Sequence, residues 1–153
     1  MLAVVTRVKN ARVEIENASV GAIEKGLLVL LGVSVEDGPV DVDYVADRVT
    51  GMRIFEDSAG KMNISPKDAG AALLVVSQFT LCGDVSQRRP SFMGAARPEQ
   101  AVPLYERFIS RCREAGFSVQ CGVFGADMQV FSQNDGPVTL LVDSAPKRGA
   151  SEQ

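Results

Sequence analysis

The opening stretch of the chain most constrains the fold, because it is dominated by aliphatic side chains arranged in short runs. The stretch LAVVTRVKNARVEIENASVGAIEKGLLVLLGVSV is interrupted at Asn10, Asn17 and Gly26. Valine and isoleucine favour strands, whereas asparagine and glycine favour tight turns. The stretch therefore predicts three or four strands joined by tight turns. Its longest apolar run, GLLVLLGVSV, is about half a membrane span and predicts a buried strand.

Two later segments change to helical periodicity. Apolar residues of the segment 39–52 share one helical face, and Pro39 suits the first turn. The segment 97–117 has a second such face, but Pro103 predicts that its regular helix begins only there. AALLVVSQFTL predicts a central strand, and FSVQCGVFG, DMQVFSQ and PVTLLVD predict three closing strands. EDSAGKMNISPKDAG is expected to be a loop, and SAPKRGASEQ a frayed tail.

This order of elements predicts a mixed α/β or α+β fold. We expect mainly antiparallel sheets that close toward a barrel-like core, with two covering helices. With 153 residues, the chain is long enough for one hydrophobic core, so a single domain over residues 1–153 is expected.

The absence of histidine removes several kinds of chemistry. One chain cannot form a Ser-His-Asp or Cys-His pair, nor a histidine-ligated metal site. Cys82, Cys112 and Cys121 form no CxxC pair, so neither a metal nor another cofactor is expected. Asp43 and Asp47 lie one helical turn apart and predict a solvated face rather than a metal site. Reduced thiols and no recognisable signal peptide favour the cytoplasm and no membrane association.

The net charge of −3 argues against extensive binding of phosphates. Contact with RNA would need a local basic patch, and the best candidate is QRRPSFMGAAR. Its arginines, Arg88, Arg89 and Arg97, have no acidic residue between them. This segment is either such a patch or a solvated basic loop.

Polar residues end two of the apolar runs. In SQFTL, Ser77 and Thr80 offer hydroxyls and Gln78 an amide, but an ordinary strand end has the same composition. Strict alternation separates the two hydroxyls, so they face one pocket only if the strand bends or ends near Phe79. In NDGPVT, the Gly136-Pro137 step predicts a turn into a strand, and its peptide bond can be cis or trans.

Several motifs in order resemble the D-aminoacyl-tRNA deacylase family of the bacterial and eukaryotic type. They are the opening AVVTRVKNARVEIENASVGAIEKGLLVLLGV, LLVVSQFTL, RPSF, FGADMQV and NDGPVTLLVDS, and the resemblance covers essentially the whole chain. One departure is VSQRRPSF, which lacks an expected glycine and is one residue shorter before RPSF.

The resemblance implies an enzyme that hydrolyses the ester bond of D-aminoacyl-tRNA, releasing free D-amino acid and tRNA. It further implies a homodimer with active sites at the interface, where SQFTL of one subunit meets NDGPVT of the other. The catalytic residues would be Ser77, Gln78, Phe79 and Thr80. A cis Gly136-Pro137 bond would exclude L-aminoacyl groups, which is chiral proofreading in translation quality control. Glycine has no side chain to exclude, so glycyl-tRNA, including mischarged tRNA-Ala, is an expected substrate.

Two mechanisms of hydrolysis are considered. Thr80 could be the nucleophile, but the sequence offers it no base. The 2′-hydroxyl of the terminal adenosine could instead assist, while the protein positions the ester. We favour the second hypothesis, with Gln78 holding the substrate and the Phe79 amide stabilising the oxyanion.

Two other functions remain open at this point. One is a nucleic-acid-binding dimer with weak or no deacylase activity. The other is a related deacylase whose Gly-Pro bond is trans and whose chiral preference differs.

Overall fold

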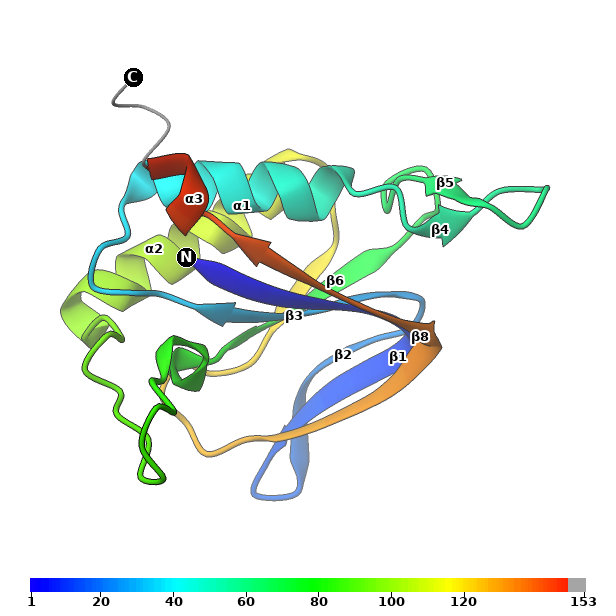
Figure 1. Ribbon diagram of the computed structural model, residues 1–153. Coiled ribbons are helices and arrows are strands. Elements are labelled where there is room, and N and C mark those ends of the chain that lie inside the picture. Colours follow the sequence, from blue (N-terminus) through cyan, green and yellow to red (C-terminus); the bar gives the residue numbers. More distant parts are fainter. Residues whose placement is uncertain (149–153) are drawn as a thin grey trace.

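A curled sheet carries two long helices on one of its faces (Figure 1). The computed structural model describes residues 1–148. The helices are α1 (Pro39–Gly51), α2 (Pro98–Glu114), the short α3 (Ala145–Arg148) and the 3-10 helix η1 (Phe79–Cys82). The strands are β1 (Leu2–Ile15), β2 (Ala18–Ile23), β3 (Gly26–Gly32), β4 (Phe55–Glu56), β5 (Met62–Ile64), β6 (Ala72–Ser77), β7 (Val119–Cys121) and β8 (Gln129–Asp143). The predicted mixed α+β class is confirmed.

The main sheet has the order β2-β1-β3-β6-β7, and β8 pairs with the remaining edge of β1. The long β1 pairs antiparallel with β3 over its first half and with β2 over its second half. β6 runs parallel to both β3 and β7. The two ends of this order approach each other, since a Cβ added at Gly21 of β2 would lie 2.8 Å from the carbonyl oxygen of Cys121 in β7. The sheet is therefore nearly closed, as the barrel-like prediction requires.

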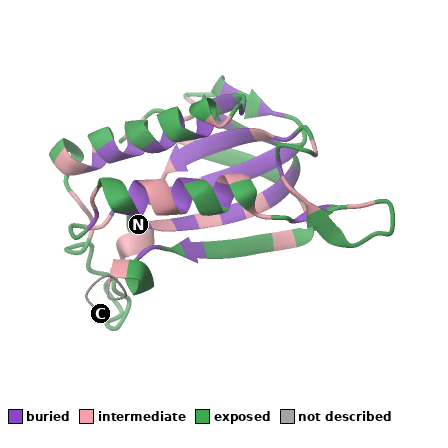
Figure 2. Cartoon of the chain, turned by 90° about the horizontal axis from the view of Figure 1, so that it is seen from above, coloured by how far each residue is buried: buried purple, intermediate pink, exposed green. Residues whose placement is uncertain are grey.

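The central strands β3 and β6 are buried on both faces. Leu27 and Leu73 pack toward the helices, whereas Leu28 and Leu74 pack inside the curl of the sheet. This alternation accounts for the near-continuous apolar runs of both strands. Figure 2 shows the buried residues of the sheet beneath the two helices, whose outer faces are exposed.

The opening stretch forms three strands, and β1 continues through Asn10 without a break. The turn that ends β1 lies at Glu16 and Asn17, both of which have positive φ values, 49° and 65°. Asparagine tolerates this left-handed conformation better than most residues, so Asn17 marks the turn correctly. Asn10 sits in the strand, where its amide donates to Gln133 of β8 at 2.9 Å.

The prediction that the second helix begins at Pro103 is wrong, because α2 begins at Pro98. The first turn is held by Gln100, whose Nε2 donates to the carbonyl oxygens of Val35 and Asp37, each at 3.1 Å. Pro103 removes one helical hydrogen bond at an exposed position, where water can satisfy the carbonyl. The tertiary anchor of the first turn outweighs this loss.

Two other segments are more ordered than expected. The predicted loop after α1 contains the hairpin β4–β5. The predicted frayed tail contains α3, where Arg148 pairs with Asp37 at 2.6 Å and Asp41 at 3.0 Å. Ser144 is buried and donates its hydroxyl proton to Asp41. The rest of the predicted tail, residues 149–153, lies outside the described residues.

Candidate active site

The first sequence-predicted motif lies where β6 ends. The Gln78 amide donates to the Leu31 carbonyl of β3 at 2.8 Å, and the chain then turns into η1. The prediction of a strand through Leu81 is therefore wrong, and the strand ends at Ser77. The turn packs closely on Gly32, where an added Cβ would lie 3.0 Å from the Gln78 carbonyl oxygen. The 3-10 helix places Ser77, Gln78 and Phe79 along one rim.

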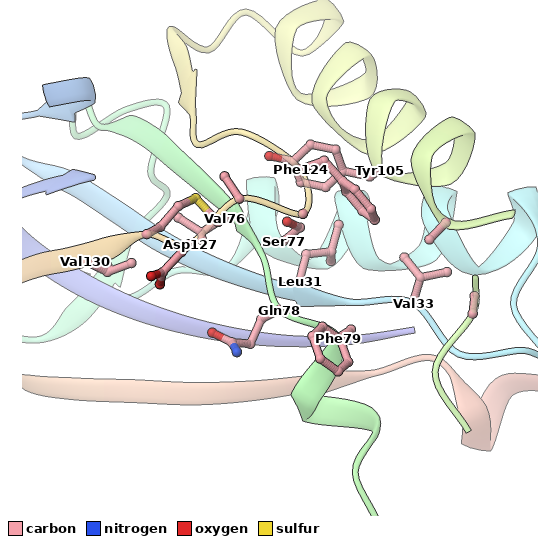
Figure 3. A pocket seen from close by; sticks show the side chains of 15 residues that line it. Leu31, Val33, Val76, Ser77, Gln78, Phe79, Tyr105, Phe124, Asp127 and Val130 are labelled. Carbon is pink, nitrogen blue, oxygen red and sulfur yellow. The ribbon is translucent and has the colours of Figure 1, made fainter. Parts of the chain in front are cut away.

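These three residues line a cavity of about 270 Å³ between the end of β6, α2 and the segment before β8 (Figure 3). The walls are mainly apolar, and the polar side chains come from Ser77, Gln78, Tyr105 and Asp127. The other lining residues are Leu31, Val33, Val76, Ala96, Ala101, Phe124, Gly125, Ala126, Met128 and Val130. An apolar cavity with a few polar groups at one edge is typical of a small-ligand site.

Thr80 is close to this cavity but does not line it. The Gln78 Nε2 group donates a hydrogen bond to the Thr80 hydroxyl oxygen. An amide N–H₂ group is a donor only, so it cannot take a proton from that hydroxyl. Thr80 is therefore oriented by Gln78 but is not activated by it.

Aromatic side chains line the cavity at two places. Phe79 is 55% exposed and meets Phe92 edge to face, with ring centroids 5.3 Å apart. At the second place, Tyr105 packs against Phe124 with centroids 5.7 Å apart and donates its hydroxyl proton to the Val75 carbonyl at 3.1 Å. Burial, with a smaller effect of Cys121, raises the pKa of Tyr105 above its usual value. Tyr105 thus remains a neutral wall residue.

The second motif forms an outward bulge in β8. The register pairs Thr6 with Thr139 and then Val8 with Asn134, so the intervening residues of β8 leave the ladder. The prediction of two separate strands, DMQVFSQ and PVTLLVD, is therefore wrong, because β8 is one bulged strand. The Gly136-Pro137 peptide bond is cis, the isomer that the family resemblance implies.

Side chains on both sides hold this bulge in place. Asn134 accepts from the Val138 amide at 2.9 Å and donates to the Thr139 hydroxyl at 3.0 Å. Arg7 is only 5% exposed, and its Nε donates to the Asp135 carbonyl at 3.0 Å. The same guanidinium donates to the Ile54 carbonyl at 2.6 Å. The buried Arg7 thus connects the bulge of β8 to Ile54, the residue that precedes β4.

One chain does not bring the two motifs together. Gly136 and Pro137 do not line the cavity that contains Ser77, Gln78 and Phe79. In Figure 1 the bend of β8 lies at the far side of the molecule from η1, which is the short dark green helix. The two motifs can therefore share a site only across two copies of the chain.

The remaining candidate groups have structural partners. Asp43 is bound by Arg107 at 2.9 Å and Arg111 at 3.1 Å, so its face is ion-paired rather than simply solvated. The hydrogen bond from Arg107 is the main cause that lowers the pKa of Asp43. Within residues 1–148, no group of three or more cysteine or acidic side chains is placed to hold a metal ion. In the same residues, no helix is long and apolar enough to span a membrane.

Sequence reasoning assigns no role to several residues of the cavity wall. Tyr105 shares the apolar face of a helix, and aromatic residues at helical spacing usually belong to a core. Phe124, Asp127 and Met128 lie in the quoted motif FGADMQV, yet nothing in their pattern distinguishes a cavity wall from a strand connection. Only the tertiary structure brings them opposite Ser77.

Comparisons with known proteins give the class of the protein. A family model described as D-Tyr-tRNA(Tyr) deacylase matches residues 4–143. A D-aminoacyl-tRNA deacylase of Thermosipho africanus is 53% identical over 145 residues, covering 94% of this chain and 97% of that protein. Another, of Desulfatibacillum aliphaticivorans, is 56% identical over 145 residues, covering 94% and 99%. A solved structure described as c-Myc DNA Unwinding Element Binding Protein is 38% identical with a TM-score of 0.89, covering 94% and 99%.

These matches define the class as tRNA deacylases, which are hydrolases. Within that class, the chain belongs to the D-Tyr-tRNA(Tyr) deacylase family. The sequence-based recognition is thereby confirmed.

Proposed function

We propose that this protein hydrolyses the ester bond of D-aminoacyl-tRNA in the cytoplasm and releases the D-amino acid and tRNA. Membership of the deacylase family supports the reaction. The observation that carries the site is the cavity at the end of β6, with Ser77, Gln78 and Phe79 on its rim. Its volume of about 270 Å³ suits one part of the substrate, such as the terminal nucleoside or the aminoacyl group.

The substrate's own 2′-hydroxyl assists the hydrolysis in this proposal. Thr80 has a donor, Gln78, where a nucleophile would need a base. The first amides of a 3-10 helix have no intrahelical acceptor, so the Phe79 N–H is available to stabilise an oxyanion. Gln78 holds the ester, and Ser77 and Thr80 adjust the geometry of the rim.

A second copy of the chain completes the site. The free edge of β8 has no paired strand among the described residues, and the strand is exposed along most of its 15 residues. Its exposed apolar side chains include Phe131, Leu140 and Leu141, the last of them 71% exposed. A long exposed apolar strand of this kind is normally covered by a partner. A homodimer would bury it and bring Gly136 and Pro137 to the partner's η1.

In the dimer, the backbone of Gly136 and Pro137 would occupy the space that an L-amino-acid side chain requires. Exclusion of this kind rejects one enantiomer without recognising any side chain of the other. Many D-aminoacyl groups would then be accepted. Glycyl-tRNA, including glycine mischarged on tRNA-Ala, would be hydrolysed because it has no side chain to exclude.

The function is tested by comparing D-tyrosyl-tRNA with L-tyrosyl-tRNA, using purified protein in the presence and absence of a chelator. We expect rapid loss of the D-ester only, at equal rates in both conditions. A rate that depends on restoring metal would contradict the proposed mechanism. Failure to hydrolyse either ester would contradict the proposed activity.

Subunit mixing tests the shared site. Phe79→Pro removes the amide proton and the ring, and Gly136→Ala places a Cβ 2.7 Å from Val138 in a residue with φ of +133°. Each variant alone should be inactive. After subunit exchange in a 1:1 mixture, half of the dimers contain one subunit of each variant. Each of these mixed dimers has one site in which both motifs are unchanged and one in which both are altered. The mixture should therefore regain about a quarter of wild-type activity. No recovery despite demonstrated exchange would show that the site does not span two subunits.

A nucleic-acid-binding dimer with weak or no deacylase activity is the second candidate. The solved relative that is 38% identical favours it, because that protein is named for binding a DNA unwinding element. Binding of tRNA or DNA without turnover in the deacylation assay would support this alternative.

A further inference from the structure

Three neighbouring arginines differ from every other arginine in the described residues. The side chains of Arg88, Arg89 and Arg97 are exposed and have no ion pair, hydrogen bond or ring contact within residues 1–148. Each of the others has a carboxylate, carbonyl or aromatic partner: Arg7, Arg12, Arg48, Arg53, Arg107, Arg111, Arg113 and Arg148. The guanidinium groups that remain available for an external anion are therefore gathered in one segment.

That segment is a closed hairpin rather than a loose loop. The amide of Asp84 donates to the Ser91 carbonyl at 2.8 Å, and the amide of Ser91 donates back at 2.9 Å. The Asp84 carboxylate accepts a hydrogen bond from the Ser86 amide at 2.8 Å. This hydrogen bond is the main cause that lowers the pKa of Asp84. The hairpin therefore presents Arg88 and Arg89 at its tip, while its one acidic side chain is engaged at the base.

The hairpin is joined directly to the rim of the candidate active site. Phe92, which follows the hairpin, packs edge to face on Phe79. The same ring fits against Gly83, where an added Cβ would lie 2.9 Å from it. A polymer whose end occupies the cavity would therefore pass next to this hairpin.

The apolar residues of this segment suit a nucleic-acid strand. Val85 is 77% exposed and Met93 is 86% exposed, on either side of Arg88 and Arg89 in the sequence. Single strands bind to surfaces that combine basic side chains for the phosphates with aromatic side chains for the bases, and the exposed Phe92 supplies an aromatic ring here. The protein's net charge is −3, so this local surface differs in sign from the chain as a whole.

We infer that residues 84–97, which are the hairpin and the segment that joins it to α2, bind the phosphates of the single-stranded 3′ end of the tRNA. The inference rests on the proposed function, because that function places the 3′-terminal nucleotide in the cavity. Arg88 and Arg89 would contact the phosphates of the nucleotides that precede it. Arg97 lies at the start of α2 and would contribute its charge to the same surface.

The test uses Arg88→Gln/Arg89→Gln with two substrates, D-tyrosyl-tRNA and the D-tyrosyl ester of adenosine, which has no phosphate. On the tRNA substrate we expect kcat/KM to fall on the order of tenfold at low salt, mainly through KM. The slope of log kcat/KM against log salt concentration should become shallower by about 1.4, or about 0.7 for each phosphate contact. Hydrolysis of the adenosine ester should not change.

The matched control is Lys61→Gln/Lys67→Gln, which removes the same charge from exposed positions outside the hairpin. It should leave both the rate and the salt slope unchanged. Equal effects of the two double variants, or no effect of the arginine variant, would overturn the inference. An equal loss on both substrates would also overturn it, because the arginines would then act on the ester site.

Failure of the proposed function is distinguishable from failure of this inference. If wild-type protein hydrolyses neither substrate, the function fails, and binding of uncharged tRNA to the same variants still tests the hairpin. Weaker and less salt-dependent binding by the arginine variant alone would support the inference. Identical binding of wild type and variant would refute it.

Discussion

D-tyrosyl-tRNA that ends in 2′-deoxyadenosine should be hydrolysed on the order of 10²–10⁴-fold more slowly than the natural substrate, the range expected for losing a group that assists proton transfer. Thr80→Ala should retain most of its activity. The reason is the hydrogen bond from Gln78 to Thr80, which orients the hydroxyl but offers it no base. Single-turnover rates with saturating protein measure the chemical step for both changes.

The control is spontaneous hydrolysis of the two esters in buffer, since a neighbouring hydroxyl also affects the uncatalysed rate. Each enzymatic rate is divided by its own uncatalysed rate before comparison. The opposite pattern, an inactive Thr80→Ala variant and rapid hydrolysis of the 2′-deoxy substrate, would identify Thr80 as the nucleophile.

Arg7→Met should reduce both the stability and the chiral selectivity of the protein. Methionine keeps much of the buried volume but removes the donors to the carbonyls of Asp135 and Ile54. One buried and one partly buried acceptor would lose their donors, which should lower the free energy of unfolding by about 2–4 kcal/mol. The bulge would lose its tether, so we expect the ratio of kcat/KM for D- over L-tyrosyl-tRNA to fall about 10- to 100-fold.

Arg53→Met is the matched control, because Arg53 is exposed and donates to the Asn63 carbonyl at 2.9 Å. It should change stability only slightly and leave selectivity intact. Denaturant unfolding measures the effect of each substitution on stability. The ratio of kcat/KM for D- over L-tyrosyl-tRNA measures its effect on selectivity. Lower stability with unchanged selectivity would show that Arg7 supports the fold but does not position Gly136 and Pro137.

The central part of the fold follows from local sequence patterns, because β3 and β6 are buried on both faces and leave continuous apolar runs. The end of β6 cannot be predicted from the local pattern, because Phe79 and Leu81 continue the apolar pattern of the strand. The chain turns at that point because η1 packs against Gly32. A contact between segments so distant in sequence leaves no local signal.

The bulge of β8 shows the same limit. Proline lacks an N–H group, so Pro137 indicates a strand start and the local pattern predicts two strands. Both halves of β8 nevertheless pair with β1. A single strand can pair with both halves because β1 is 14 residues long, and that length is known only from the structure. The family resemblance implies Ser77 to Thr80 as site residues, and all but Thr80 line the cavity. Tyr105 and Phe124 have no sequence feature that distinguishes a cavity wall from a core.

The pairing of β1 with β8 also bears on how the protein folds. Leu2 of β1 pairs with Asp143 of β8, so one edge of the first strand is paired only when the last strand has been made. Contacts between residues this distant must overcome a large loss of chain entropy, and folds rich in them form slowly. A growing polypeptide would carry β1 with one edge unpaired throughout most of its synthesis. Unpaired edges promote aggregation, so newly made chains should depend on chaperones more than the finished protein does.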